Sequence, residues 1–241
     1  MSFNWNWCSS KGRSRPENQD CAGIALGGSF LVAVVADGVF SRPRSGELAK
    51  ALVSNLVNRV VAREHPPESD EVRQWIEDAF HELKSERAPK SSSSFIVATF
   101  ARDQLLFTVH AGDCRVGTLT PQSDVYWRTP VHSVATAFQA LPESELCVHP
   151  ARNQLTRTFG TKRCCTPEIL DFRCAYPGGA VLATDGYWAE LPTEFQKEIF
   201  STAWKDQREF EDDVSRLTIN WGALPGKRTN ASENLYVRDV S

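Results

Sequence analysis

The chain has 241 residues, and its 27 Lys and Arg residues against 30 Asp and Glu residues give a formal net charge of −3. Hydrophobic residues make up 41% and charged residues 24%, a composition typical of a folded soluble domain and unlike that of a disordered chain. The slightly acidic balance argues against a general nucleic-acid-binding protein. No apolar run reaches the roughly 18 residues that a membrane-spanning helix needs.

Cysteine usage indicates a reducing compartment. The chain has seven cysteines, so at least one cannot pair within it, and the adjacent Cys164 and Cys165 suit no ordinary disulfide. No two cysteines have the Cys-x-x-Cys spacing of a structural zinc site. The N-terminal residues 1–13 lack the apolar core of a secretory signal. We therefore expect free thiols and a cytoplasmic protein.

The N-terminal part predicts strands followed by two helices. Residues 3–7 alternate aromatic residues with Asn, which is the period of a half-buried strand. Residues 23–38 predict a hairpin with a Gly-Gly turn, and its second strand is apolar enough to be covered on both faces. An apolar stripe at i+4 steps predicts a helix from Ser45 to about Glu64, and a second apolar face predicts a helix over 72–83.

The rest of the chain predicts more strands around an irregular middle, from about Pro130 to Thr166, that has no clean periodicity. The expected elements are, in order, strands at 94–101 and 105–113, strand and turn at 115–128, a strand pair at 168–175 and 179–186, helices at 193–207 and 209–221, a loop at 222–232 and a strand at 234–240. Helices that cluster after runs of antiparallel strands predict one α+β domain over residues 1–241.

Apolar strands repeatedly end at an acidic residue beside glycine. The pattern occurs at Asp37-Gly38, Gly112-Asp113 and Asp185-Gly186, and the final strand begins at Glu233-Asn234. Carboxylates at the ends of buried strands are costly to desolvate unless they are paired, hydrogen-bonded or bound to metal. A single Asp-Gly is more often a turn, but the repetition favours a site for Mg²⁺ or Mn²⁺, which prefer oxygen ligands.

The segment from Arg15 to Asp20 adds an arginine to these acids. A guanidinium offers a planar fork for a phosphate or a carboxylate. A charged loop before a strand is commonly just solvated, so this segment alone is a weak signal. Together with several candidate metal carboxylates it indicates phosphoryl hydrolysis, in which the arginine binds the phosphate and the metal generates hydroxide.

The order of these motifs resembles the metal-dependent serine/threonine protein phosphatases of the type 2C class, over nearly the whole chain. Any one matching segment is weak, but eight in the family's order are specific. The segments are RPENQD (15–20), VVADG (34–38), SGELAKALV (45–53), HAGDCRV (110–116), RTPVHS (128–133), NQLTRTFG (153–160), VLATDGYW (181–188) and SENLYV (232–237).

The resemblance implies a sandwich of two antiparallel sheets flanked by helices, in four α-β-β-α layers, with two Mn²⁺ or Mg²⁺ ions at one end and room for a third. It implies a role for each matched residue. Asp37 bridges two ions, Gly38 ligates through its carbonyl, Asp185 and Glu233 hold the first ion, Asp20 reaches the second through water, Asp113 joins Asp185 at a third site, and Arg15 holds the substrate phosphate.

The activity that the resemblance implies is hydrolysis of phosphoserine and phosphothreonine on proteins by a hydroxide that bridges two metal ions, without a phosphoenzyme. The expected partner is a phosphorylated protein substrate, and the enzyme would oppose a Ser/Thr kinase. We expect a monomer with no nucleic-acid or membrane partner.

Three departures from the family pattern favour an alternative. Gln19 replaces a Glu beside Asp20, Glu233 replaces the terminal Asp, and Val39 stands where some relatives carry a His proposed as general acid. A pseudophosphatase, which acts as a binding or regulatory module with weakened metal sites, would account for them. A metal phosphoesterase that acts on a small molecule is a third interpretation.

Other residues have simpler interpretations. Arg42 and Arg44 follow the first Asp-Gly, and a solvated basic loop is favoured over contact with an acidic or phosphorylated partner. Cys114 is expected to be a small buried residue, because no Cys-x5-Arg loop of a cysteine phosphatase is present. His132 is expected to lie on the surface or to be hydrogen-bonded.

Overall fold

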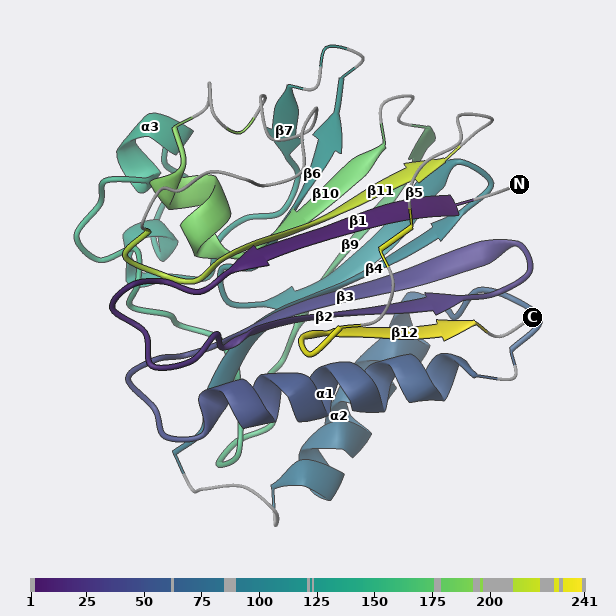
Figure 1. Cartoon of the computed structure of the whole chain (residues 1–241), viewed down its shortest axis with the longest axis horizontal. Coiled ribbons are helices and arrows are strands. Elements are labelled where there is room, and N and C mark those ends of the chain that lie inside the picture. The colour runs from purple at the N-terminus through teal and green to yellow at the C-terminus, as the bar shows by residue number, and fades with distance from the viewer. Residues whose placement is uncertain are drawn as a thin grey trace.

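Two β-sheets packed face to face form the centre of the computed structural model (Figure 1). The structure describes residues 3–61, 63–84, 90–120, 122, 124–175, 179–192, 196, 210–221, 228–229 and 232–239. The five-stranded sheet has the order β1 (Phe3–Ser10), β11 (Val214–Trp221), β10 (Ala180–Ala183), β6 (Arg115–Leu119) and β7 (Val125–Trp127). The seven-stranded sheet has the order β12 (Leu235–Asp239), β2 (Asp20–Leu26), β3 (Phe30–Gly38), β4 (Ser92–Ala101), β5 (Gln104–Ala111) and β9 (Glu168–Ala175), and β8 (Phe159–Gly160) pairs with β4.

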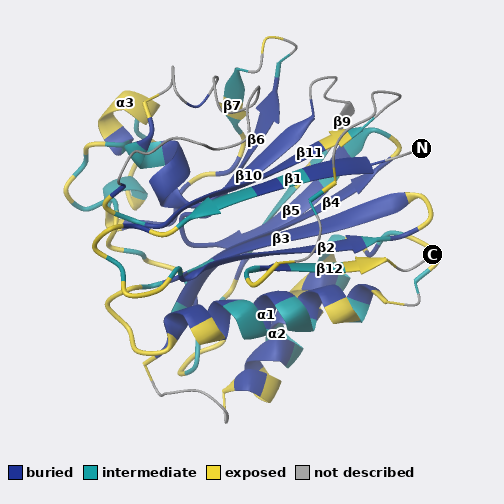
Figure 2. Cartoon of the chain, in the orientation of Figure 1, coloured by how far each residue is buried: buried dark blue, intermediate teal, exposed yellow. Residues whose placement is uncertain are grey.

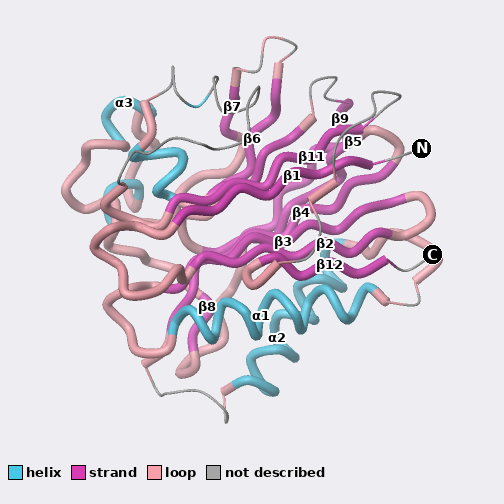
Figure 3. Tube along the Cα trace, viewed as in Figure 1, coloured by secondary structure: helices cyan, strands magenta, loops and turns pink. Residues whose placement is uncertain are grey.

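Helices cover the outer faces. The helices α1 (Ser45–Val60) and α2 (Ser69–Leu83) lie on the outer face of the seven-stranded sheet (Figure 3). Against the outer face of the other sheet pack α3 (Glu143–Leu146) and a π-helical turn, η2 (Gly186–Glu190), next to a short 3-10 turn, η1 (Val134–Thr136). This arrangement confirms the predicted α+β sandwich with flanking helices. Among the described residues, no helix combines the length and the apolar character needed to cross a membrane.

Side-chain alternation along β3 explains how one strand contributes to two hydrophobic cores, one on each face of its sheet. Val32 and Val34 face α1 and α2, whereas Leu31 and Val35 face the opposite sheet. Successive side chains of a strand point to opposite faces, so an apolar residue at every position predicts burial on both sides. Figure 2 shows β3 buried along nearly its whole length, as its sequence predicts.

Three expectations are changed by the structure, and a fourth is not tested. Residues 168–175 and 179–186 do not pair with each other, because β9 joins β5 in one sheet and β10 lies between β11 and β6 in the other. Residues 214–221 form strand β11 rather than a helix. Strand β12 runs parallel to β2, so the seven-stranded sheet is mixed. The helix expected at 193–207 and most of the 222–232 loop lie outside the described residues.

The packing of α1 on β2 generates a stability prediction. A Cβ at Gly23 would lie 2.6 Å from the side chains of both Val53 and Val57, so the close approach of α1 requires glycine there. We expect Gly23→Ala to lower the free energy of unfolding by about 1–3 kcal/mol, because this interface has no room for a methyl group. Urea denaturation measures the change.

The matched control is Gly28→Ala in the β2–β3 turn, where an added Cβ meets no atom within 4 Å. We expect this variant to be within about 0.5 kcal/mol of the unaltered chain or slightly more stable. Equal stability of the two variants would contradict the close packing of α1 on β2.

Candidate functional site

Five aspartates line one cleft of about 320 Å³: Asp37, Asp113, Asp185, Asp212 and Asp213. Each comes from the end of a strand. Asp37 is the second-last residue of β3, Asp113 and Asp185 follow β5 and β10 by two residues, and Asp212 and Asp213 directly precede β11. The loops that join these strand ends gather at one end of both sheets, on the left in Figure 3. The sandwich therefore brings together acids that are up to 176 positions apart, from 37 to 213.

A sixth carboxylate, Asp20, lies behind the cleft. The register of the β2–β3 hairpin places Asp20 directly opposite Asp37. Asp20 is fully buried, and Thr184 Oγ1 donates a hydrogen bond to its Oδ2 at 2.9 Å. Burial, followed by the nearby Asp213 and Asp185, holds the pKa of Asp20 well above its usual range. The hairpin thus holds two carboxylates side by side where neither ionises easily.

Asp37 is the acid that faces the most other acids. Its pKa is well above the usual range because of burial first, and then because of the charges of Asp20, Asp185 and Asp113. Ser93 Oγ donates to its carbonyl oxygen at 2.9 Å and so fixes the end of β3. A cation placed among these side chains would remove the repulsion that raises the pKa.

The turn that carries Asp113 is fixed by backbone hydrogen bonds. Ser94 Oγ accepts from the amide nitrogens of Asp113 and Cys114 at 2.9 and 2.8 Å. Gly112 has a φ of 107°, and a Cβ there would lie 2.4 Å from Ser94 Oγ, so the turn requires glycine. Burial, and then the charge of Asp185, raises the pKa of Asp113 to about 7. Its rigid turn holds this acid in the cleft with its Oδ1 unbonded among the described residues.

Two arginines offset part of the negative charge. Arg15 makes two hydrogen bonds to Asp212, the Nε–Oδ1 distance being 2.6 Å, and its guanidinium lies 4.0 Å from the centre of the Phe40 ring. Arg152 Nη1 donates to Asp185 Oδ2 at 3.0 Å. Six aspartates against two arginines leave an excess of acidic groups in and behind the cleft, which favours the binding of cations.

The Asp213 side chain binds the backbone of the Arg15 loop. It accepts hydrogen bonds from the amide nitrogens of Gly12 at 2.9 Å and Gln19 at 2.7 Å. These bonds fasten the Arg15 loop to the start of β11. Since Gln19 contributes its backbone here, the replacement of Glu by Gln leaves this connection intact.

The aspartates fit divalent cations with oxygen ligands. Asp20 Oδ1 and Asp113 Oδ1 are buried oxygens with no hydrogen-bond partner among the described residues. Buried carboxylate oxygens without partners are rare unless an ion or a water satisfies them. The donor set around the cleft is oxygen alone, as Mg²⁺ and Mn²⁺ prefer. The residues present therefore fit the predicted metal ions.

A second group with metal-ligand chemistry lies behind the Asp113 turn. His110, His132 and Glu168 are, within the described ranges, the group whose ligand atoms all lie within 4.8 Å of one another. The two imidazoles are stacked, with ring centres 4.7 Å apart and planes 12° apart. Ligand lone pairs lie in the ring plane, so stacked rings do not point at one ion. Because the Gly112 amide donates to His132 Nδ1 at 3.2 Å and His132 Nε2 bonds Glu168 at 2.6 Å, the group supports the turn.

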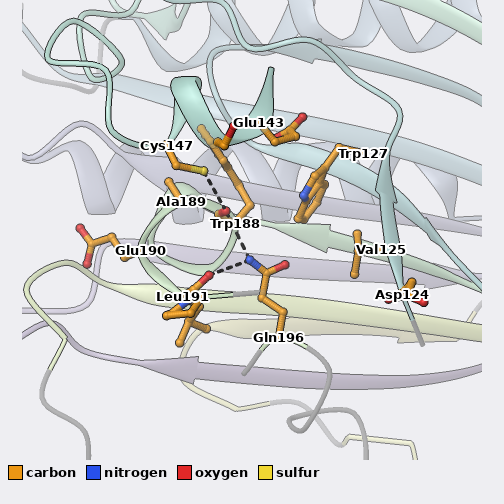
Figure 4. A pocket seen from close by; sticks show the side chains of 12 residues that line it. Asp124, Val125, Trp127, Glu143, Cys147, Trp188, Ala189, Glu190, Leu191 and Gln196 are labelled. Atoms are coloured by element: carbon orange, nitrogen blue, oxygen red, sulfur yellow. Dashed lines mark hydrogen bonds between the residues drawn. The ribbon is translucent and has the colours of Figure 1, made fainter. Parts of the chain in front are cut away.

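A larger cavity of about 530 Å³ lies beyond Trp188 (Figure 4). Trp188 Nε1 donates to the Asp113 carbonyl at 2.8 Å, and Arg115 lies 5.0 Å from the rings of both Trp127 and Trp188. Arg115 also pairs with Glu143 at 2.6 Å. This cavity does not contain the converging aspartates, and its wall holds the Asp113 turn from the side opposite the cleft.

The structure brings together most of the residues singled out from the sequence. Arg15, Asp37, Gly38, Asp113 and Asp185 line the cleft, with Asp20 behind it. As expected, Cys114 is fully buried and His132 is hydrogen-bonded.

Glu233 is the exception. It lies with Glu47 and Lys50 in another pocket, away from the aspartates. Asp212 and Asp213 occupy the cleft instead, and sequence reasoning missed them because residues 209–221 were interpreted as a helix. The signal was present: Leu217, Ile219 and Trp221 alternate with polar residues, as in a strand that follows two acids.

Comparison with solved structures shows the same fold in bacterial phosphatases. The S. agalactiae serine/threonine phosphatase superposes with a TM-score of 0.72 at 17% identity, covering 91% of this chain and 99% of that one. Stp1 of Staphylococcus aureus gives a TM-score of 0.74 at 19% identity, covering 92% of this chain and 96% of that one. MsPP of Mycobacterium smegmatis, solved with cacodylate, gives a TM-score of 0.74 at 19% identity, covering 91% of this chain and 98% of that one. At such low identity the likeness establishes the fold alone.

Sequence comparison defines the family. None of the curated proteins matches this chain. The family described as Protein phosphatase 2C matches residues 10–217, a range that includes Asp212 and Asp213 and ends before Glu233. The match therefore contains every aspartate of the cleft, and the chain belongs to the protein phosphatase 2C family.

Proposed function

We propose that the chain is a Mn²⁺- or Mg²⁺-dependent phosphatase that hydrolyses phosphoserine and phosphothreonine on proteins. The observation that carries this proposal is the cleft itself, in which five aspartates and Arg15 converge with Asp20 behind them. Family membership and the fold support serine/threonine phosphatase activity. The dependence on metal is supported by the unpartnered carboxylate oxygens and the raised carboxylate pKa values.

In this proposal, Asp37, the Gly38 carbonyl, Asp185 and Asp212 hold two ions, and Asp113 with Asp185 offers a place for a third. Asp212 replaces Glu233 in the set of ligands because it lines the cleft. When bound, the ions would supply Lewis acidity for in-line attack of water on phosphorus.

Arg15 would hold the substrate phosphate. Its Nε and Nη2 atoms form a planar fork that two oxygens of a phosphate can accept, and Phe40 limits the orientations of the guanidinium. Asp212 occupies this fork in the structure. Since Asp212 is also one of the proposed metal ligands, binding of metal and binding of phosphate would be coupled through the Arg15–Asp212 pair.

Two of the three sequence departures that favour the pseudophosphatase alternative carry less weight once the cleft is known. The departure at Glu233 has no bearing on a cleft that contains Asp212 and Asp213, and Gln19 contributes through its amide nitrogen. Val39 remains, since a valine cannot protonate a leaving group. We also propose a cytoplasmic monomer that opposes a Ser/Thr kinase.

The first test of the function is turnover. We expect release of phosphate from a phosphothreonine peptide and from p-nitrophenyl phosphate in Mn²⁺, and none in chelator. Asp37→Asn should lower kcat/KM by more than about 100-fold, because it removes a proposed metal ligand. Asp171→Asn on β9, an exposed aspartate that lines a different pocket, should leave it unchanged. Turnover that survives both chelation and Asp37→Asn would defeat the proposal.

A second prediction separates the two candidates for the terminal acid. We expect Asp212→Asn to weaken Mn²⁺ binding at least about tenfold in calorimetric titration, since it removes a ligand. Glu233→Gln should leave the titration unchanged, because its side chain lies in a separate pocket. The opposite ranking of the two variants would restore Glu233 as the ligand.

A third prediction concerns stability and pH. The pKa of an aspartate is about 3.9 in an unfolded chain. In the metal-free fold, the pKa of Asp113 is about 7. Between these values the folded state binds more protons, so its stability falls as the pH rises. We expect the Tm in chelator to fall by about 5–10 °C between about pH 5 and pH 8, and Mn²⁺ to abolish most of this fall.

The variant Asp113→Asn serves as the control for this effect. It cannot ionise at this position, so the fall of Tm in chelator should be smaller than in the unaltered chain. Scanning calorimetry at several pH values measures both profiles. A Tm in chelator that does not change with pH would contradict the prediction, because it would show that ionisation of the buried aspartates does not destabilise the fold.

A further inference from the structure

A pocket of about 400 Å³ near the cleft is lined by four cationic side chains: Arg42, Lys90, Lys162 and Arg163. The other described lining residues are hydroxyl-bearing residues and a glycine, so none of the acids that the structure describes lines it. We call these four side chains, with Ser92 and Thr158 between them, the basic pocket. It contrasts with the neighbouring cleft, where aspartates outnumber arginines.

The cations of the basic pocket are free to meet an anion. All four are exposed, and within the part of the chain that the structure describes none forms an ion pair. Arg44, two positions from Arg42, differs in this respect because it pairs with Glu47 at 2.6 Å. The structure thus separates the two arginines of this loop: Arg44 is tied to α1, and Arg42 is available to a ligand.

The floor of the basic pocket is ordered. Ser92 Oγ donates to Thr158 Oγ1 at 2.6 Å, and β8 pairs with the first residues of β4. Ser91 Oγ donates to the carbonyl of Pro43 at 2.8 Å. These bonds join three separate segments of the chain, so the backbones that carry Arg42, Lys90 and Lys162 are held in fixed relation.

The basic pocket shares two walls with the cleft. In the loop after β3, residues 39–41 line the cleft and Arg42 lines the basic pocket. In the segment that contains β8, Asn153 and Leu155 line the cleft, whereas residues 158 and 160–163 line the basic pocket. The two sites are therefore neighbours at the same end of the sandwich, where Figure 3 shows β8 beside the start of α1.

We propose that the basic pocket binds an aspartate or glutamate side chain that flanks the phosphorylated residue of a protein substrate. The proposal rests on the phosphatase function proposed above and adds a substrate class, acidic phosphopeptides. Clusters of arginine and lysine recognise carboxylates and other anions through charge-assisted hydrogen bonds. An extended peptide with its phosphate in the cleft would pass over a shared wall and bring a flanking residue to these cations.

Kinetics with two peptides tests the proposal. One phosphothreonine peptide carries glutamates on both sides of the phosphorylated residue, and the other carries glutamines at the same positions. We expect the unaltered chain to prefer the acidic peptide by about three- to tenfold in kcat/KM at low ionic strength, because each exposed ion pair contributes modestly. Arg42→Gln/Arg163→Gln should bring the ratio close to one, and added salt should reduce the preference.

The matched control is Lys84→Gln/Arg238→Gln, which also removes two positive charges from exposed side chains but lines neither site. This variant should keep the preference for the acidic peptide, since its two substitutions lie outside the basic pocket. A loss of the preference in this variant would indicate a general effect of net charge. A ratio near one in the unaltered chain, or an equal loss in both double variants, would overturn the proposal.

Binding gives a readout that is independent of turnover. Fluorescence anisotropy of the labelled acidic peptide in chelator should show tighter binding to the unaltered chain than to Arg42→Gln/Arg163→Gln. Equal affinities of the two proteins would contradict the proposed binding role of the basic pocket, whether or not the enzyme is active. By contrast, failure of the unaltered chain to hydrolyse p-nitrophenyl phosphate in Mn²⁺ would count against the proposed function and leave the anisotropy result standing.

Discussion

Repulsion between buried carboxylates is the constraint on which this structure depends. Asp20 and Asp37 face each other across a hairpin, and Asp113, Asp185 and Asp212 surround the same space. Such a group is unfavourable to fold without cations or protons, and the raised pKa values of Asp20, Asp37, Asp113 and Asp185 express that cost. A fold optimised for stability alone would not collect them. Their position at rigid strand ends, with unbonded oxygens, indicates that the cost is met by a ligand of opposite charge.

Hydrogen bonds around the cleft hold the aspartates in place against this repulsion. They do so by fixing the backbone near these residues, and they do not neutralise the carboxylate charges. Ser94 ties the Asp113 turn, Ser93 ties the end of β3, and Asp213 accepts two amide hydrogens from the Arg15 loop. Trp188 holds the Asp113 carbonyl from the far side. The carboxylates cannot move apart to relieve their repulsion, because their backbones are bonded to the two sheets. Preorganised oxygen ligands of this kind need little rearrangement when cations bind.

The sequence predicted the parts of this site that depend on local pattern. The apolar run of β3 that ends at Asp37, the Gly112-Asp113 turn and the Asp185 strand end are local features, and each reached the cleft. Pairing between distant strands was not predictable locally, which is why β9 and β10 were wrongly paired and β11 was wrongly interpreted as a helix. The error at β11 had a functional consequence. It hid Asp212 and Asp213, and the acid before the last strand, Glu233, was taken as the ligand in their place.

The division of charge between neighbouring pockets then bears on substrate choice. An acidic cleft without metal repels an acidic peptide, whereas bound divalent ions would offset its negative charge. The cations of the basic pocket keep their sign in both states, since they are exposed and lie apart from the aspartates. One short loop carries Arg42 together with Val39, Phe40 and Ser41, which line the cleft. The proposed contact with the flanking acid therefore lies on the same loop as the edge of the reaction site.

Loops are also where relatives of a common fold vary most, because a loop can change without disturbing the sheets that hold the aspartates. Substrate preference in this chain would then be set on a surface that evolution can alter while the carboxylate framework, constrained by its own repulsion, stays fixed.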